Sequence, residues 1–258
     1  MYIKSIDFSK YSSIKVGQTT NVLILEKGDQ IPKDRYLIGG ANNLLISPNP
    51  PKLMMLGKDF SYIKEKDGYL TIGAATPTGK IISYAKKHNI KGFEFCSKLP
   101  GTLGGMIAMN AGVKEYEVFN ILHSVKIDSE SILVENIEHG YRFANLNGIA
   151  TEAKFKIFDG FNKKLLEELI NLRSNQPKLP SAGSAFKNPK DDYAGRLIED
   201  VGLKGLTKGS MQFSDMHANF LVNLGSGTFK DAKYLIDLAK ERVFNKFNIE
   251  LIEEVKIL

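Results

Sequence analysis

Residues 98–112 read K-L-P-G-T-L-G-G-M-I-A-M-N-A-G, a segment with four glycines and one proline. Glycine has no Cβ and accepts positive φ, so backbone N–H groups in such a segment can approach a ligand closely. Successive N–H groups in a loop of this kind form a concavity that binds anions. The same composition is also typical of a tight turn with close helix packing, so this segment alone leaves both interpretations open.

The chain of 258 residues has an ordinary globular composition, with 43% hydrophobic and 25% charged residues. Its single cysteine, Cys96, excludes an intramolecular disulfide and a CxxC metal site, and it suits a reducing compartment. Residues 1–10 are polar and show no signal-peptide pattern, and no apolar run approaches the roughly 20 residues of a membrane span. We therefore expect a cytoplasmic protein with no membrane insertion and no bound metal.

The formal net charge is +6 at pH 7. The lysines are scattered in pairs instead of forming one basic block, which favours a solvated basic surface over nucleic-acid binding. A basic surface also suits small anionic ligands, such as diphosphates and carboxylates. We therefore expect small anions, and no nucleic acid, as partners.

Apolar segments bounded by turn residues predict a mixture of short strands and helices. Strands are predicted at residues 22–26, 36–39, 44–47, 53–56, 69–73, 125–128, 131–135, 150–157, 219–223 and 249–257. Helices are predicted from Thr76 and Pro77 to residue 89, at residues 163–173 and 193–201, and after Thr228. Thr228 and Asp231 have capping-box spacing, and the helix that they open carries an apolar stripe that includes Val243 and Phe244.

Two other segments carry candidate functional residues, each with an ordinary structural alternative. Ser184 lies in P-S-A-G-S-A-F-K-N-P, residues 180–189, which lacks the G-x-S-x-G pattern of a nucleophile elbow. Ser184 could be an ordinary serine of a turn or a catalytic residue. Arg142, in H-G-Y-R-F, could pair with a carboxylate or phosphate, or it could lie on the surface. One of Glu253 and Glu254 faces inward if the last segment alternates as a strand, and a solvated pair is the alternative.

Five sequence blocks, in this order, resemble the UDP-N-acetylenolpyruvoylglucosamine reductase family, FAD-dependent enzymes of peptidoglycan precursor synthesis. The blocks are K-V-G at 15–17, I-G-G-A-N-N-L-L-I at 38–46, G-F-E-F-C-S-K-L-P-G-T-L-G-G with M-N-A-G at 92–112, Y-R at 141–142, and G-S-A-F-K-N-P through H-A-N-F-L-V-N to E-V at 183–255. Ala41 and Asn42 depart from the family's usual glycine and serine. The compact region between Arg142 and Ser184 resembles a shorter subclass that lacks a tyrosine-bearing loop.

The resemblance implies an α+β flavoprotein of three domains. Two non-Rossmann FAD-binding domains of the vanillyl-alcohol-oxidase-like type would span residues 1–56 and 57–174, and a C-terminal α+β substrate-binding domain would span residues 175–258. Proline-rich breaks at residues 47–51 and 175–180 agree with two boundaries. FAD would be the bound cofactor, NADPH the hydride donor and a UDP-sugar the substrate, and we expect a monomer.

The resemblance also implies a role for particular residues. By position in the glycine-rich loops, cofactor binding maps onto Gly39, Gly40, Ala41, Asn42, Asn43, Leu44, Pro100, Gly101, Thr102, Gly104, Gly105, Asn110, Ala111 and Gly112. Substrate binding maps onto Lys187 and Asn188, and catalysis onto Arg142, Ser184 and Glu254. Hydride would reach the β-carbon of the enolpyruvyl group, and Ser184 would give a proton to the α-carbon. Arg142 and Glu254 would stabilise the enolate that develops between these steps.

Two other functions stay open at this point. A related FAD-binding oxidoreductase could act on another substrate, although the G-S-A-F-K-N-P block and the terminal E-V argue against it. A non-catalytic module that binds nucleotides or nucleic acid would be colourless, whereas either enzyme would show a flavin spectrum.

Overall fold

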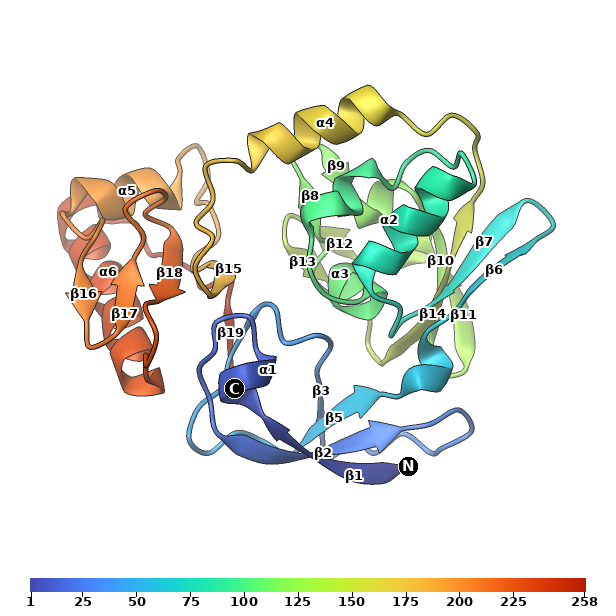
Figure 1. Cartoon of the computed structure of the whole chain (residues 1–258), viewed down its shortest axis with the longest axis horizontal. Coiled ribbons are helices and arrows are strands. Elements are labelled where there is room, and N and C mark those ends of the chain that lie inside the picture. Colours follow the sequence, from blue (N-terminus) through green and yellow to red (C-terminus); the bar gives the residue numbers. More distant parts are fainter. The chain divides into compact units, whose positions relative to one another are not determined.

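The computed structural model describes residues 1–258, which form two compact units. Each unit combines chain segments that lie far apart in the sequence (Figure 1). Unit 1 comprises Met1–Lys4, Val22–Gly40 and Lys52–Ser174, and unit 2 comprises Ser5–Asn21, Ala41–Pro51 and Asn175–Leu258. The division into three domains stays a prediction.

Unit 1 contains a five-stranded antiparallel sheet in the order β11-β10-β14-β7-β6. Its central strand, β14 (Ala150–Lys156), pairs with β10 (Leu122–Ile127) on one side and with β7 (Tyr69–Gly73) on the other. The outer strands are β11 (Glu130–Leu133) and β6 (Ile63–Lys66). Buried and exposed residues alternate along the second half of β14, as expected of a strand with one face in a core.

Three helices share the core of this sheet. They are α2 (Thr78–Lys87), α3 (Leu103–Ala108) and α4 (Lys163–Leu172), and each contributes to the buried cluster that contains Leu70 and Phe155. Figure 1 shows them in the green and yellow part of the chain. The shorter elements of unit 1 are η1 (Lys58–Phe60), η2 (Glu94–Lys98), β8 (Gly112–Val113), β9 (Tyr116–Glu117), η3 (Val118–Asn120), η4 (Val134–Asn136), β12 (His139–Gly140) and β13 (Phe143–Ala144).

A second sheet has the order β1-β2-β5-β3. Strand β5 (Leu53–Leu56) lies parallel to β2 (Thr19–Leu25) and to β3 (Tyr36–Leu37), while β1 (Tyr2–Asp7) lies on the other side of β2. The N–H of Ile38 continues this pairing, because it donates to the Met54 carbonyl oxygen over 2.9 Å. The first glycine-rich loop therefore begins directly at the end of a sheet strand.

Unit 2 contains a four-stranded antiparallel sheet and two longer helices. The sheet has the order β15-β18-β17-β16, and its core cluster is filled from α5 (Ala194–Asp200) and α6 (Phe229–Phe247). Thr228 is confirmed as the N-cap of α6, since the Asp231 N–H donates to Thr228 Oγ1 over 3.2 Å. The Asp231 carboxylate accepts from the Thr228 hydroxyl over 2.6 Å, in place of the backbone N–H bond of a complete capping box. The remaining elements of unit 2 are α1 (Phe8–Tyr11), β4 (Leu44–Leu45), β15 (Ser181–Ser184), β16 (Thr207–Lys208), β17 (Met211–Phe213), β18 (Phe220–Asn223) and β19 (Lys256–Ile257).

Local expectations were wrong at several points. Residues 103–108 form α3, although the glycine content had indicated a loop throughout residues 98–112. Helix α2 has Pro77 at its N-cap, one position later than expected, and the Thr76 hydroxyl donates to the Tyr62 carbonyl oxygen instead of capping. Phe244 is 52% exposed although it lies beside the buried stripe of α6, because the packed face covers only part of the helix surface.

None of the helices is both long and apolar enough to cross a membrane. The His, Cys, Asp and Glu side chains form no group of three that could hold a metal ion.

Candidate active site

Arg142 lies in the tip of a two-residue hairpin in unit 1. Strands β12 and β13 pair His139 with Ala144 and Gly140 with Phe143, so Tyr141 and Arg142 form the turn. Arg142 has φ of 55°, in the left-handed region that costs a residue with a side chain about 1–2 kcal/mol. Such conformations persist where the surroundings enforce them, and they concentrate at functional positions.

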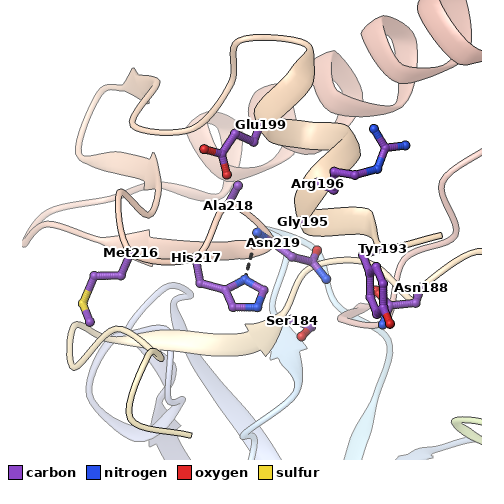
Figure 2. A pocket seen from close by; sticks show the side chains of 10 residues that line it. All are labelled: Ser184, Asn188, Tyr193, Gly195, Arg196, Glu199, Met216, His217, Ala218 and Asn219. Atoms are coloured by element: carbon purple, nitrogen blue, oxygen red, sulfur yellow. Dashed lines mark hydrogen bonds between the residues drawn. The ribbon is translucent and has the colours of Figure 1, made fainter. Parts of the chain in front are cut away.

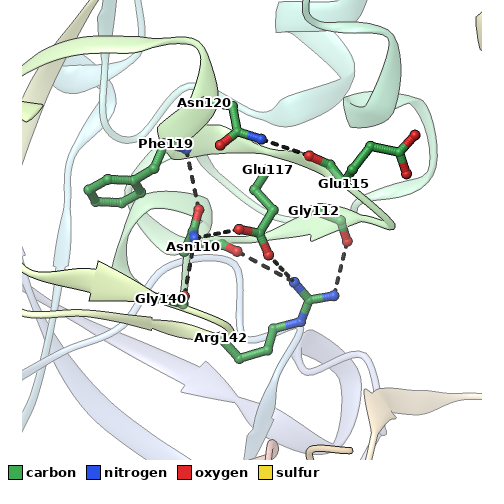
Figure 3. Close-up of polar contacts among 8 residues, drawn as sticks. All are labelled: Asn110, Gly112, Glu115, Glu117, Phe119, Asn120, Gly140 and Arg142. Carbon is green, nitrogen blue, oxygen red and sulfur yellow. Dashed lines mark hydrogen bonds and ion pairs between the residues drawn. The ribbon is translucent and has the colours of Figure 1, made fainter. Parts of the chain in front are cut away.

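The Arg142 guanidinium is held by the second glycine-rich segment (Figure 3). Its Nη2 donates to the Gly112 carbonyl oxygen over 3.0 Å, and its Nη1 donates to the Asn110 carbonyl oxygen over 3.4 Å. The Glu117 carboxylate lies 3.7 Å from Nη1. The predicted catalytic arginine and the predicted cofactor-binding residues Asn110 and Gly112 are therefore direct neighbours.

The two glycine-rich loops meet in unit 1. A Cβ added at Gly39 would lie 2.9 Å from Thr102 Oγ1 and 3.9 Å from the Gly105 Cα atom. A Cβ at Gly104 would lie 3.2 Å from Ala74. Thr102 caps α3, with its Oγ1 accepting from the Gly105 N–H over 3.5 Å. Gly39 therefore packs closely against the Thr102 side chain, and Gly104 packs closely against Ala74.

The continuation of the first loop belongs to unit 2. Ala41 is buried with φ of 52°, a conformation that glycine adopts more easily, and its carbonyl oxygen accepts from the Ser13 N–H. The Asn42 side chain donates to Ser13 Oγ, and the Asn43 side chain donates to the Glu254 carbonyl oxygen over 2.9 Å. Both amide side chains therefore bind groups of the chain itself.

The other predicted cofactor-binding residues lie at the ends of short elements. Leu44 is buried in β4, and Ala111 is buried after α3. Pro100 and Gly101 lie directly before α3, and Gly101 has φ of 120°.

Ser184 and Glu254 are brought together in unit 2, although they are far apart in the sequence. Ser184 ends β15 and pairs with Phe220 of β18. The next residue, Ala185, accepts the Glu254 N–H at its carbonyl oxygen over 2.9 Å. Phe186 forms a bridge with Glu253, and the Lys187 N–H donates to the Ile252 carbonyl oxygen. The two predicted catalytic residues therefore lie on hydrogen-bonded neighbouring segments.

The segment after Ser184 is held by a buried asparagine. The Asn219 side-chain oxygen accepts from the Phe186 N–H over 3.0 Å, and its side-chain nitrogen donates to the Phe186 carbonyl oxygen over 2.8 Å. The Asn219 carbonyl oxygen also accepts from the Ala185 N–H over 2.7 Å. Asn219 thus continues the strand pairing beyond Ser184 with its own side chain.

A cavity of about 290 Å³ opens beside Ser184 within unit 2 (Figure 2). Its lining comprises Ser184, Asn188, Tyr193, Gly195, Arg196, Glu199, Met216, His217, Ala218 and Asn219. Predicted substrate residue Asn188 is in this lining, and its side-chain oxygen also accepts from the Ala194 N–H over 3.1 Å. Lys187, the other predicted substrate residue, does not line it. The cavity therefore brings Ser184 and Asn188 to one concave surface.

His217 faces this cavity and was not among the predicted site residues. Its Nδ1 accepts from the Asn219 N–H over 3.3 Å, and a Cβ at Gly195 would lie 3.3 Å from its Cε1. Burial lowers the pKa of His217, which favours the neutral ring at neutral pH. In the sequence, only the H-A-N-F block, which contains His217 and Asn219 and contributed to the family resemblance, indicated that these residues could belong to the site.

Comparison with solved structures identifies the class of this mixed α+β fold. A solved structure described as UDP-N-acetylenolpyruvylglucosamine reductase from Thermus caldophilus matches the whole chain with a TM-score of 0.85. It is 28% identical in sequence, and the match covers 100% of this chain and 99% of that one.

Sequence comparison gives the same result. UDP-N-acetylenolpyruvoylglucosamine reductase of Campylobacter jejuni strain RM1221 is 49% identical, over 98% of this chain and 99% of its own length. The enzyme of that name from Helicobacter pylori strain J99 is 45% identical over 98% of both chains. Residues 175–258 match the family described as UDP-N-acetylenolpyruvoylglucosamine reductase, C-terminal domain.

The chain belongs to the UDP-N-acetylenolpyruvoylglucosamine reductase family. It is therefore an oxidoreductase with the reductase activity of that family, which serves peptidoglycan precursor synthesis. The resemblance noted in the sequence is confirmed.

Proposed function

We propose that the chain reduces UDP-N-acetylglucosamine enolpyruvate to UDP-N-acetylmuramate, with bound FAD and with NADPH as the hydride donor. The observation that carries the proposal is the pairing of the Glu254 segment with Ala185, next to Ser184 and its cavity. It supports a shared role for two residues that the family resemblance names as catalytic. A cytoplasmic location, a monomeric state and the three-domain flavoprotein architecture belong to the same proposal.

The two glycine-rich loops are proposed to hold FAD. Gly39 packs closely against the Thr102 side chain, and a glycine-rich loop of this kind lets backbone N–H groups approach a diphosphate. Among the backbone hydrogen bonds of these loops, none uses the N–H of Gly39, Gly40 or Gly101 as its donor. These N–H groups suit an anionic ligand, so the residues present fit the cofactor.

When bound in these loops, FAD would supply hydride, taken from NADPH, for the β-carbon of the enolpyruvyl group. Ser184 is proposed to give the α-carbon its proton from the Oγ atom, so that the carbon–carbon double bond becomes a single bond. Arg142 and Glu254, the latter as a protonated carboxyl that donates a hydrogen bond, are proposed to bind the neighbouring carboxylate, on which negative charge develops before the proton arrives. The cavity beside Ser184 is proposed to bind the UDP-sugar, with Asn188 and Lys187 as substrate-binding residues.

The test is Ser184→Ala, with Ser181→Ala as the matched control in the same strand. We expect Ser184→Ala to keep its flavin spectrum and its reduction by NADPH, because Ser184 lies outside the glycine-rich loops. Turnover of the enolpyruvyl substrate should fall on the order of 10³-fold, because a proton donor in the transition state is lost. Ser181→Ala should retain turnover.

Two outcomes would count against the proposal. If Ser184→Ala turned over substrate within about threefold of the unchanged protein, Ser184 would not be the proton donor. If purified protein showed no flavin spectrum and took up none from added FAD, the assignment of the loops to this cofactor would be wrong.

A further inference from the structure

Glu117 lies between Arg142 and Asn110 and contacts both through its carboxylate (Figure 3). Oε1 lies 3.7 Å from Arg142 Nη1, and Oε2 accepts from Asn110 Nδ2 over 2.8 Å. The side chains of Arg142 and Glu117 are 18% and 22% exposed, so the ion pair is largely removed from water. Partial burial of this kind makes the interaction less screened than one on the surface.

Asn110 anchors this arrangement to the rest of unit 1. It is 1% exposed, and its Nδ2 also donates to the Gly140 carbonyl oxygen over 3.1 Å. Its Oδ1 accepts from the Phe119 N–H over 3.3 Å. One buried amide therefore connects the end of the second glycine-rich segment, the hairpin that carries Arg142, and the turn after Glu117.

The Arg142 side chain needs such restraint to act reproducibly. An arginine side chain has about 2 kcal/mol of rotamer entropy, and the guanidinium binds carboxylates best when its planar group is already oriented. The carbonyl oxygens of Gly112 and Asn110 hold two of its nitrogen atoms. Glu117 adds the charged contact, and its own position is set by Asn110.

We propose that Glu117 is a positioning residue that holds the Arg142 guanidinium in the orientation that binds the substrate carboxylate. This inference rests on the proposed role of Arg142. Glu117 acts through Arg142 and need not touch the substrate. The negative charge of Glu117 repels the substrate carboxylate. Glu117 must therefore assist the reaction by orienting the Arg142 guanidinium, because it adds no attraction for the substrate.

This balance gives the proposal a kinetic signature. Without the Glu117 charge, electrostatic attraction of the substrate carboxylate to Arg142 is no weaker, while the guanidinium is less well oriented. We therefore expect kcat to fall and KM to stay the same or decrease. If Glu117 only supported the fold, its replacement would instead lower the melting temperature and the flavin content.

The experiment compares Glu117→Gln with Glu115→Gln. Glutamine keeps an oxygen that accepts from Asn110 Nδ2, removes the charge, and places an NH2 group where one carboxylate oxygen faced Arg142. Glu115 is an exposed glutamate in the turn just before β9, the strand that contains Glu117, and its carboxylate points away from Arg142 in Figure 3, so its variant controls for the change in net charge. The readouts are melting temperature, bound flavin, the rate of flavin reduction by NADPH, and the rate at which UDP-N-acetylglucosamine enolpyruvate reoxidises the reduced enzyme.

We expect Glu117→Gln to slow substrate-dependent reoxidation about tenfold or more, with flavin content and flavin reduction unchanged. Glu115→Gln should behave like the unchanged protein. In an Arg142→Ala background, Glu117→Gln should cause no further loss beyond about twofold, because its effect passes through Arg142. Glu117→Asp, which keeps the charge on a shorter side chain, should be slowed less than Glu117→Gln.

Each contrary result has a separate meaning. If Arg142→Ala slowed reoxidation and Glu117→Gln did not, the positioning role would be wrong and the proposed function would stand. If Glu117→Gln caused the same loss with and without Arg142, Glu117 would act by another route. If Arg142→Ala left reoxidation unchanged, the role proposed for Arg142 would fail together with that of Glu117.

Discussion

Replacing Asn219 by alanine tests whether one buried side chain holds the segment that carries Ser184. Asn219 is 3% exposed, and its amide forms both of its hydrogen bonds with the backbone of Phe186, which is fully buried. Asn219→Ala removes both bonds and leaves a buried N–H and a buried carbonyl oxygen without their partner.

The expected loss of stability follows from these two bonds. Each contributes about 1 kcal/mol net, and each unsatisfied buried group adds about 1–3 kcal/mol when water cannot reach it. Partial relaxation reduces the sum, so we expect a total of about 2–4 kcal/mol. For a protein of this size, 1 kcal/mol corresponds to roughly 2–4 °C in melting temperature. Asn219→Ala should therefore melt about 5–15 °C below the unchanged protein.

The measurement is thermal unfolding followed by circular dichroism, together with turnover below the transition. Asn245→Ala is the control, since Asn245 is exposed on α6 and alanine is the better helix former. The control should melt at or slightly above the temperature of the unchanged protein. A melting temperature for Asn219→Ala within about 2 °C of the unchanged protein would refute the reasoning.

Three further predictions use other contacts. Thr228→Ala removes the cap of α6 and should cost about 1 kcal/mol of unfolding free energy in urea titrations, and an unchanged midpoint would contradict this. Burial raises the pKa of the Cys96 thiol, so Ellman's reagent should label the native protein far more slowly than the urea-unfolded chain. The Arg196 guanidinium lowers the pKa of Asp192 to about 2, so the stability from this pair is complete above the unfolded pKa near 4 and is lost as the pH falls toward 2. In NMR titrations, Arg196→Gln should move the Asp192 pKa back up, and no change would be evidence against the pairing.

Local features were largely readable from the sequence. The cap of α6 by Thr228 depends on residues within one turn, and the strands at Leu53–Leu56 and Tyr69–Gly73 follow from short apolar runs. The order of five motifs was enough to indicate the family, because each motif is a contiguous group of residues. Helix α3 was missed because glycine has a low helix propensity, which tertiary contacts here override. One such contact is the Gly104 N–H donating to the Ala74 carbonyl oxygen.

The sequence by itself determined the family, the positions of the longer helices and of part of the strands, and the candidate residues Arg142, Ser184 and Glu254. Only the tertiary structure showed that the Glu254 segment pairs with Ala185, that Asn219 holds Phe186, and that Glu117 contacts Arg142. These contacts join residues that have no periodic or local relation, and they exist only once separate strands and turns have packed. Propensity and motif spacing carry no information about such pairings, so the arrangement around the site had to come from the fold.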